Sequence, residues 1–397
     1  MRCPSAQPST RLTNHNFTLH TLISNSTREE SINQLLAGRI EAGDFPSAVY
    51  LVAKRGRVIF TDALGEAVIE PVPYAATIDT IYDLASLTKP LITGLLCAQL
   101  IERGELSLDR AVAAYLPEFA GRDRITVRHL LTHTSGLPAW RPLRIVTGDR
   151  RERVLETIAA LHPEHAPGTR VVYSDLGFIT LGLLLERISG AQLDELARRE
   201  IFQPLQLART FFKPDRAFLT EIAACELAGN AYERGMCAAQ EGAAGAWREA
   251  LIWGEVHDGN AYFLGGAAGH AGLFANARET FLIAEQFIAG RTQLLAPQTC
   301  SLFRTDMTPH LNEARSFAWQ LAATPDSTAG DALSPDSFGH LGFTGTSCWI
   351  DPVRERIFIL LTNRTHTRTL PFVNINGVRR QFHTLAVAAL ERVREKA

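Results

Sequence analysis

The sequence Asp83-Leu84-Ala85-Ser86-Leu87-Thr88-Lys89-Pro90 begins an apolar segment that extends to about Glu102 and predicts a helix. Ser86 and Lys89 are three residues apart, so a helix places them on one face. A serine hydroxyl is a weak nucleophile until a base takes its proton, and a lysine acts as that base when burial and its neighbours lower its pKa. Taken alone, the same pattern is also typical of an N-cap serine beside an exposed lysine.

A second polar pattern follows a turn in Pro167-Gly168-Thr169-Arg170-Val171-Val172-Tyr173-Ser174-Asp175. On a short loop the phenol of Tyr173 would shuttle protons, and Asp175 would position Lys89 or a substrate by hydrogen bonding. The alternative is structural: a packed tyrosine, with Asp175 as the N-cap of a helix predicted over residues 176–188.

A third pattern, Gly339-His340-Leu341-Gly342-Phe343-Thr344-Gly345-Thr346, resembles an edge strand whose glycines allow a ligand or another backbone to come close. Its backbone N–H groups, near Gly342 and Phe343, would complete an oxyanion hole. His340 would then face a cleft. A histidine whose hydrogen bonds are satisfied within the strand is the alternative.

Strand and helix patterns at the two ends of the chain mirror each other. A helical pattern and a predicted hairpin lie near the N-terminus, and two strand patterns and a terminal helix close the chain. The middle, about 85–300, is mostly helical. The expected terminal elements are helices over 31–42 and 378–396 and strands over 48–54, 58–64, 338–350 and 357–362.

This order predicts an α/β unit, an antiparallel sheet built from both chain termini and flanked by helices, with an all-α unit inserted between them. The active site is expected in the cleft between the two units. The predicted divisions are a loose leader over 1–28, an α/β unit from 29–85 and 301–397, and a helical unit over 86–300.

Charge and hydropathy exclude several classes of protein. The 397 residues include 40 Lys and Arg against 42 Asp and Glu, a net charge of −2, whereas a general nucleic-acid or anionic-membrane binder shows a basic surplus. No apolar run reaches the ~18–20 residues of a membrane span, and no secretory signal pattern is visible. We therefore expect a cytoplasmic protein whose partner is a small-molecule or short-peptide substrate. The sequence leaves the oligomeric state open.

The cysteine spacing predicts reduced, mostly buried thiols. It contains no CxxC pair, and a zinc site needs clustered ligands, so neither a metal nor another cofactor is expected. The six cysteines are Cys3, Cys97, Cys225, Cys237, Cys300 and Cys348.

The three polar patterns, in this order, resemble those of serine β-lactamases and penicillin-binding-protein-like hydrolases. The branch with class C β-lactamases, D-aminopeptidases and esterases is particularly similar. The resemblance covers about residues 30–395. Further stretches that carry it are 102–109 (ERGELSLD), 115–117 (YLP), 125–138 (ITVRHLLTHTSGLP) and 269–274 (GHAGLF).

The resemblance implies the β-lactamase/transpeptidase-like fold and assigns roles to particular residues. Ser86 would be the nucleophile that forms an acyl-enzyme, and Lys89 and Tyr173 would share the general-base and general-acid work. The backbone N–H groups of Ser86 and Phe343 would form the oxyanion hole. Water would then hydrolyse the acyl group from Ser86.

Two residues depart from the β-lactamase pattern. Asp175 stands where β-lactamases usually have Asn, and His340 stands where they usually have Lys. That lysine helps to hold the substrate carboxylate, and a largely neutral imidazole would hold it less well. Together with the missing export signal, this makes β-lactam hydrolysis a side activity at most.

Residues 254–270 resemble a stretch of hydrolases associated with peptidoglycan recycling, which include serine-type N-acetylmuramoyl-L-alanine amidases. His257, Asp258 and His270 would line the substrate pocket. A loop held by local hydrogen bonds is the alternative. A metal site from these residues is disfavoured, because they lack the spacing of helical metal ligands.

The sequence therefore predicts a serine hydrolase that cleaves an amide or ester through acyl-Ser86. An amidase or peptidase acting on muropeptides or D-amino-acid peptides is one alternative, and a carboxylesterase acting on small esters with weak or no β-lactamase activity is another. A non-catalytic, penicillin-binding-like sensor is the alternative of a different class. A sensor, however, needs no set such as Ser86, Lys89 and Tyr173.

Overall fold

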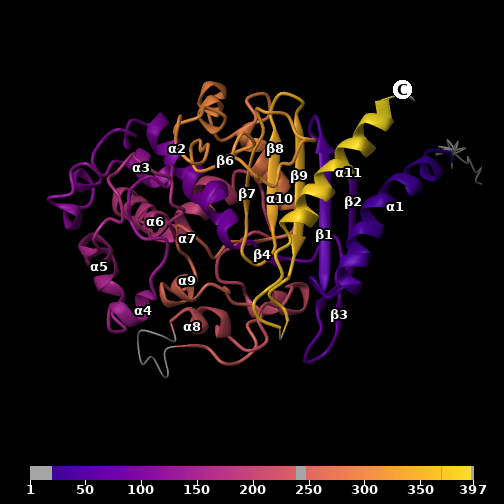
Figure 1. Cartoon of the computed structure of the whole chain (residues 1–397), viewed down its shortest axis with the longest axis horizontal. Helices are drawn as coiled ribbons and strands as arrows, with labels where there is room; N and C mark the ends of the chain where they lie inside the picture. Colours follow the sequence, from indigo (N-terminus) through magenta and orange to yellow (C-terminus); the bar gives the residue numbers. More distant parts are fainter. Residues whose placement is uncertain (1–19, 238–246, 368, 395–397) are drawn as a thin grey trace, which may run out of the picture.

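The computed structural model describes residues 20–237, 247–367 and 369–394. A seven-stranded antiparallel sheet lies on one side of this described part, and most of the shorter helices lie on the other (Figure 1). The strands of the sheet are β1 Ser47–Lys54, β2 Arg57–Val68, β3 Tyr74–Ala75, β6 Gln320–Leu321, β7 Phe338–Leu341, β8 Ser347–Asp351 and β9 Arg356–Thr362.

Both ends of the chain contribute to this sheet, as predicted. The strand order is β3-β2-β1-β9-β8-β7-β6, so β1 from the N-terminal part pairs directly with β9 from the C-terminal part. Val49 lies opposite Leu361, and Val52 lies opposite Phe358. The central pair of strands therefore joins segments about 300 residues apart in the sequence.

Alternation along β1 divides its side chains between two layers. Val49 and Leu51 face the core that also contains α10 (Ala277–Ala284), whereas Tyr50 and Val52 face the core beneath α1 (His20–Glu41) and α11 (Asn376–Arg394). Figure 1 shows these two terminal helices side by side across one face of the sheet. The sheet is thus covered by helices on both faces, which explains why β9 is buried along its whole length.

The remaining helices belong mainly to the middle of the chain (Figure 1). A second, two-stranded sheet pairs β4 Tyr82–Asp83 with β5 Phe274–Ala275 and thereby connects both borders of this region. The helices are α2 Leu95–Glu102, α3 Val127–Leu131, α4 Leu143–Val146, α5 Val154–Ala160, α6 Asp175–Ser189, α7 Leu193–Ala197, α8 Ala231–Cys237 and α9 Gly259–Phe263.

Two local predictions were wrong. The single strand expected over 338–350 is divided into β7 and β8 by a turn, in which the Gly342 N–H donates to the Thr346 carbonyl at 2.7 Å and Gly345 adopts a φ of 114°. The leader expected over 1–28 is helical from His20 onward, where α1 begins. Residues 1–19 lie outside the described residues, and the division into units stays a prediction.

Five of the predicted thiols lie within the described part of the chain. Each is buried and forms no disulfide: Cys97, Cys225, Cys237, Cys300 and Cys348. Cys3 lies outside the described residues. Across the described ranges, no single helix is long and apolar enough to cross a membrane, although the bent pair 175–189 and 193–202 meets the length and composition criteria together.

Candidate active site

The segment that carries Ser86 is fixed in place by hydrogen bonds from both sides. Asp83 ends β4, and its Oδ1 accepts the N–H of Ala85 at 2.8 Å. Ala85 has a φ of 48°, a backbone conformation that side chains other than glycine rarely adopt. From the turn between β7 and β8, Thr344 and Thr346 donate their hydroxyls to the carbonyls of residues 83 and 84. Strain beside Ser86 is therefore held in place by the sheet.

Lys89 is completely buried, and its ammonium has three partners. Nζ lies 2.7 Å from Asp175 Oδ1, 2.9 Å from Ser86 Oγ and 3.1 Å from the His270 carbonyl oxygen. The Tyr173 ring completes the surroundings, with its centroid 4.8 Å from Nζ. The structure therefore brings Ser86, Lys89, Tyr173 and Asp175 together, as the sequence patterns predicted.

The protonation of this group differs from the expectation. Burial lowers the pKa of Lys89, but the charge of Asp175 and the Tyr173 hydroxyl raise it by more, so the net pKa lies above its ordinary value rather than below it. Burial also raises the pKa of Tyr173, although Lys89 opposes this. At rest the group therefore contains a charged lysine and a neutral phenol, so Lys89 would have to release a proton before it could act as a base.

The structural alternative for Asp175, that of an N-cap, does not hold. Ser174 caps α6, because its Oγ accepts the Gly177 N–H at 3.2 Å. Asp175 is the first residue of the helix, and its carboxylate is free to pair with Lys89. The preceding loop is held by His133, whose Nδ1 accepts the Ser174 N–H and whose ring packs 4.5 Å from that of Tyr173.

His340 lies in β7 and lines the cavity beside Tyr173. Its Nδ1 donates to the Leu341 carbonyl at 2.9 Å, whereas its Nε2 is buried and has no hydrogen-bond partner among the described residues. Burial holds the pKa of His340 well below its ordinary value, and the charges of Lys89 and Arg315 act in the same direction. The imidazole is therefore neutral.

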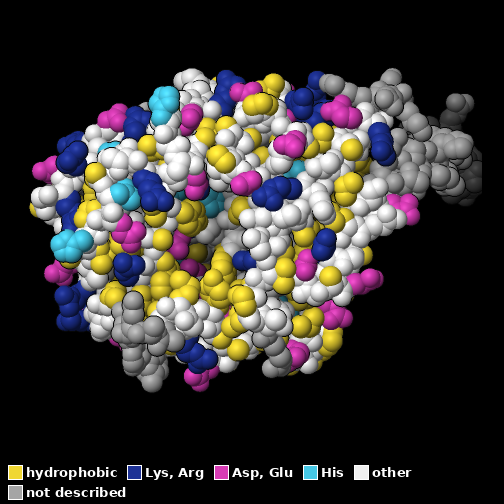
Figure 2. Space-filling model, in the orientation of Figure 1, with side chains coloured by type: hydrophobic (Ala, Val, Ile, Leu, Met, Phe, Trp, Pro, Cys, Tyr) yellow, Lys and Arg dark blue, Asp and Glu magenta, His cyan; other side chains and the backbone are white. Residues whose placement is uncertain are grey.

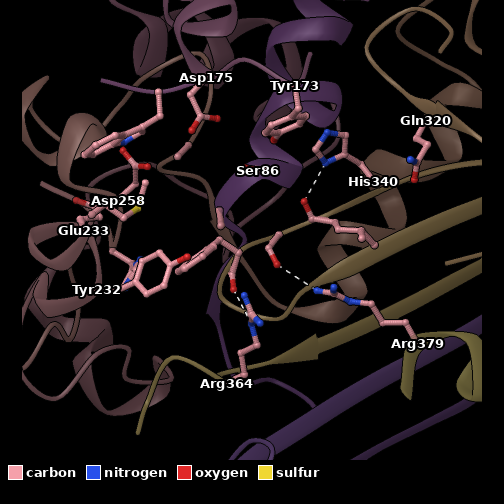
Figure 3. Close-up of a pocket in the computed structure, with 18 of the residues that line it drawn as sticks. Ser86, Tyr173, Asp175, Tyr232, Glu233, Asp258, Gln320, His340, Arg364 and Arg379 are labelled. Atoms are coloured by element: carbon pink, nitrogen blue, oxygen red, sulfur yellow. Dashed lines mark hydrogen bonds between the residues drawn. The ribbon is translucent and has the colours of Figure 1, made fainter. Parts of the chain in front are cut away.

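The turn that contains Gly342 and Phe343 is held by two arginines that sequence patterns did not reveal. Arg379 Nη2 donates to the carbonyls of Gly342 and Thr346, and Arg364 Nε donates to the carbonyl of Phe343 (Figure 3). No short motif marks these arginines: Arg364 follows β9 and Arg379 lies in α11, and only the folded chain brings them to the turn.

The segment 254–270 packs directly behind Ser86. The His257 N–H donates to Asp83 Oδ2 at 2.7 Å, and the His257 ring bonds to Glu226. His257 and Asp258 line the cavity as expected. The prediction that His270 lines it was wrong: its ring is buried and bonds to Asp258, and only its carbonyl contacts Lys89.

These residues surround a cavity of about 430 Å³ that opens near the centre of the face shown in Figure 2. His340 and Gln320 lie on one side of it, and Glu233 and Asp258 lie on the other (Figure 3). Arg364 and Arg379 line the cavity near the sheet. Aromatic side chains of Trp140, Tyr173, Tyr232 and Phe343 supply much of its apolar surface.

The family model described as Beta-lactamase matches residues 32–377. The chain belongs to the beta-lactamase family. A relative named putative D-alanyl-D-alanine carboxypeptidase from Escherichia coli (strain K12) is 31% identical, over 85% of this chain and 83% of the relative. A protein of the same name from Salmonella enteritidis PT4 is also 31% identical, over 86% and 84% of the two chains.

Solved structures agree on the fold. A class C beta-lactamase matches with a TM-score of 0.71 and 17% identity, over 95% of this chain and 98% of its own. EstCE1, described as a hydrolase with promiscuous acyltransferase activity, matches with a TM-score of 0.68 and 22% identity, over 93% and 99%. The protein is thus a member of a serine hydrolase family with relatives that are named as putative carboxypeptidases.

We predict that Gly342→Ala lowers kcat/KM on the order of 100-fold, because small displacements of reacting groups have effects of this size. A Cβ on Gly342 would lie 1.9 Å from Thr346 Oγ1 and 2.6 Å from the Leu84 carbonyl oxygen, so the turn must move away from Ser86. Ester turnover and thermal unfolding would be measured together. Gly38→Ala is the control, since no atom lies within 4 Å of its added Cβ. Equal activity of both variants would contradict the role of this close approach.

Proposed function

We propose that this protein hydrolyses amide bonds of small carboxylate-bearing substrates, such as D-amino-acid peptides or muropeptides, through an acyl-Ser86 intermediate. The observation that carries the proposal is the contact of 2.9 Å between Ser86 Oγ and the buried Lys89 Nζ, at the wall of a cavity large enough for a short peptide. A structural N-cap serine beside an exposed lysine would not produce this arrangement.

The reaction begins from the form in which Lys89 has released one proton to solvent and is a neutral amine. Ser86 Oγ then bonds to the substrate carbonyl carbon, and its proton passes to the group formed by Lys89 and Tyr173. Negative charge on the carbonyl oxygen is stabilised by the N–H groups of Ser86 and Phe343. The C–N bond breaks as the leaving amine takes the proton. Water then attacks the acyl carbon, its proton returns through the same group, and the free acid and the Ser86 hydroxyl are regenerated.

Cationic side chains support a substrate with a carboxylate. Arg315, Arg364 and Arg379 line the cavity, and within the described ranges neither Arg364 nor Arg379 forms an ion pair with a carboxylate. Because His340 is neutral, these arginines would take over attraction of the substrate anion. The relatives named putative D-alanyl-D-alanine carboxypeptidase support a peptidase, and a role in peptidoglycan recycling fits the same substrates.

A carboxylesterase acting on small esters is the second candidate. It is favoured by the aromatic lining of the cavity and by the neutral His340, which provides no fixed charge for a carboxylate. The acyl-Ser86 chemistry would be the same, with an alcohol in place of the leaving amine.

We predict that a fluorophosphonate probe labels the protein and that Ser86→Ala abolishes both labelling and turnover of a short p-nitrophenyl ester. The Ser86 hydroxyl is the atom that the probe modifies. Labelling would be followed by intact-protein mass spectrometry. Ser301→Ala is the control, since Ser301 is exposed and is not among the residues that line the cavity. Undiminished turnover by Ser86→Ala would overturn the mechanism, and tight peptide binding without turnover would favour the sensor.

Parallel turnover of matched substrates distinguishes the candidates. We expect kcat/KM for short peptides with a terminal D-amino acid to exceed that for nitrocefin, because the neutral His340 holds a β-lactam carboxylate less well. An esterase would instead prefer uncharged p-nitrophenyl esters over both. A large preference for nitrocefin would contradict the expectation that β-lactam hydrolysis is at most a side activity.

Replacing Asp175 tests the protonation of Lys89. The charge of Asp175 raises the pKa of Lys89, so Asp175→Asn should lower this pKa and make the neutral amine available at lower pH. The acidic limb of the kcat/KM profile should then move toward low pH. Asp109→Asn, at an exposed ion pair, is the control. An unmoved limb would show that Lys89 does not set it.

A further inference from the structure

Arg379 lies in α11 and is almost completely buried, with 4% of its surface exposed. Its Nη2 donates to the carbonyl oxygens of Gly342 at 3.1 Å and Thr346 at 2.9 Å. Its Nη1 donates to Asn376 Oδ1 at 2.9 Å. Both terminal nitrogens of the guanidinium therefore form hydrogen bonds within the protein, and its charge is directed at the backbone of the turn between β7 and β8.

The charge of Arg379 is unfavourable for the stability of the free protein. Across the described ranges no carboxylate forms an ion pair with it, and its Nε is buried without a hydrogen-bond partner. Burial and the neighbouring charge of Arg364 lower the pKa of Arg379 to about 9, so the side chain stays charged at neutral pH. A buried charge without a counter-charge is destabilising, and an apolar side chain would fill the same space without this cost. Packing alone therefore does not account for an arginine at this position.

The Gly342 carbonyl and the Phe343 N–H belong to one peptide unit. This peptide bond is trans, so its C=O and its N–H point in opposite directions. A donor that holds the Gly342 carbonyl consequently turns the Phe343 N–H away from Arg379. Among the described residues this N–H donates to no other group, which leaves it available to a ligand.

The hydrogen bonds to the Gly342 carbonyl also change the strength of the N–H at the other end of the peptide unit. The carbonyl oxygen accepts from the Gly345 N–H at 3.1 Å as well as from Arg379. A charged donor polarises the peptide unit, so the Phe343 N–H becomes a stronger donor. In the proposed reaction this N–H faces the negative oxygen of the intermediate, where stronger donation lowers the barrier.

The same turn is fixed against the segment that carries Ser86. The Thr346 hydroxyl donates to the Leu84 carbonyl at 2.9 Å, and a Cβ on Gly342 would lie 2.6 Å from that oxygen. The turn therefore has little freedom to move relative to this segment. An N–H oriented by the turn keeps a constant position relative to Ser86.

We propose that Arg379 is a positioning residue for the oxyanion hole: through the peptide unit of Gly342 and Phe343, it orients the N–H of that unit and strengthens its donation to the negative oxygen. This role rests on the proposed function, in which acyl-Ser86 forms. Figure 3 shows Arg379 on the side of the cavity away from Tyr173, so the role is separate from the movement of the Ser86 proton. It also differs from attraction of a substrate carboxylate, because it applies equally to uncharged substrates.

Turnover of an uncharged ester tests this role, because such a substrate has no carboxylate for an arginine to attract. Loss of a direct oxyanion donor costs about 100- to 1000-fold, and Arg379 acts through such a donor, so we expect Arg379→Met to lower kcat/KM for p-nitrophenyl acetate on the order of tenfold. Arg380→Met is the matched control, since Arg380 is the next residue of α11 and donates to the carbonyls of Asp326 and Ser327. A loss confined to substrates with a carboxylate would overturn the proposal.

The infrared carbonyl band of the acyl-enzyme separates this role from a general loosening of the fold. With an isotope-labelled acyl carbonyl, difference spectra after rapid mixing report the strength of hydrogen bonding to the acyl oxygen on Ser86. We expect the band to lie at higher wavenumber in Arg379→Met than in the wild type or in Arg380→Met. Arg379→Lys keeps the charge but lacks the planar group that bonds to both carbonyls, so its band should lie between the two. This variant decides the question if Arg379→Met does not fold.

Labelling by the fluorophosphonate distinguishes failure of this inference from failure of the proposed function. If Ser86 is labelled but every folded Arg379 variant keeps the wild-type rate and the wild-type band, the role of Arg379 is refuted and the hydrolase stands. If Ser86 is not labelled in the wild type, the hydrolase is refuted and the role of Arg379 with it.

Discussion

The site depends on the contacts that stabilise the buried ammonium of Lys89. A charged group removed from water is strongly unfavourable unless it is paired and hydrogen-bonded. Its three partners come from three separate places: Ser86 on the same segment, Asp175 at the start of α6, and the carbonyl of His270. The segment 83–90, the helical region and the segment 254–270 must therefore all be in position before this charge is stabilised. The close approach of Ser86, Lys89 and Asp175 thus follows from the need to pair and hydrogen-bond one buried cation.

The two departures from the β-lactamase pattern change the charge of the cavity in the same direction. Aspartate in place of asparagine adds a negative charge beside Lys89, and a neutral imidazole in place of lysine removes a positive charge from the opposite wall. Arg364 and Arg379 keep positive charge near the sheet, but most of their donors hold the turn at Gly342 and Phe343. The same arginines thus hold the turn at Gly342 and Phe343 and supply the remaining positive potential, whereas Glu233 and Asp258 line the cavity on another side.

Much of the fold and of the reactive group could be predicted from the sequence, because both depend on local patterns. Alternation marks β1 and β9, and the spacing of three residues places Ser86 beside Lys89. Arg364 and Arg379 gave no such signal, since their contacts with the turn between β7 and β8 exist only in the folded chain. The sequence patterns predicted a role for the His270 side chain, whereas Lys89 contacts the His270 carbonyl. Every residue has a backbone carbonyl, so the residue type at position 270 could not predict this contact.

Asp83 connects three parts of the cavity wall. Its carboxylate accepts the N–H groups of Ala85 and His257, and its carbonyl accepts the Thr344 hydroxyl. One buried residue therefore sets the position of the segment that carries Ser86, of the loop that carries Asp258, and of the turn between β7 and β8. The loop that carries Asp258 cannot move relative to Ser86 without disturbing these bonds. In the proposed reaction, a substrate that contacts this loop would consequently present its carbonyl at a fixed distance from Ser86, which is the condition for fast acylation.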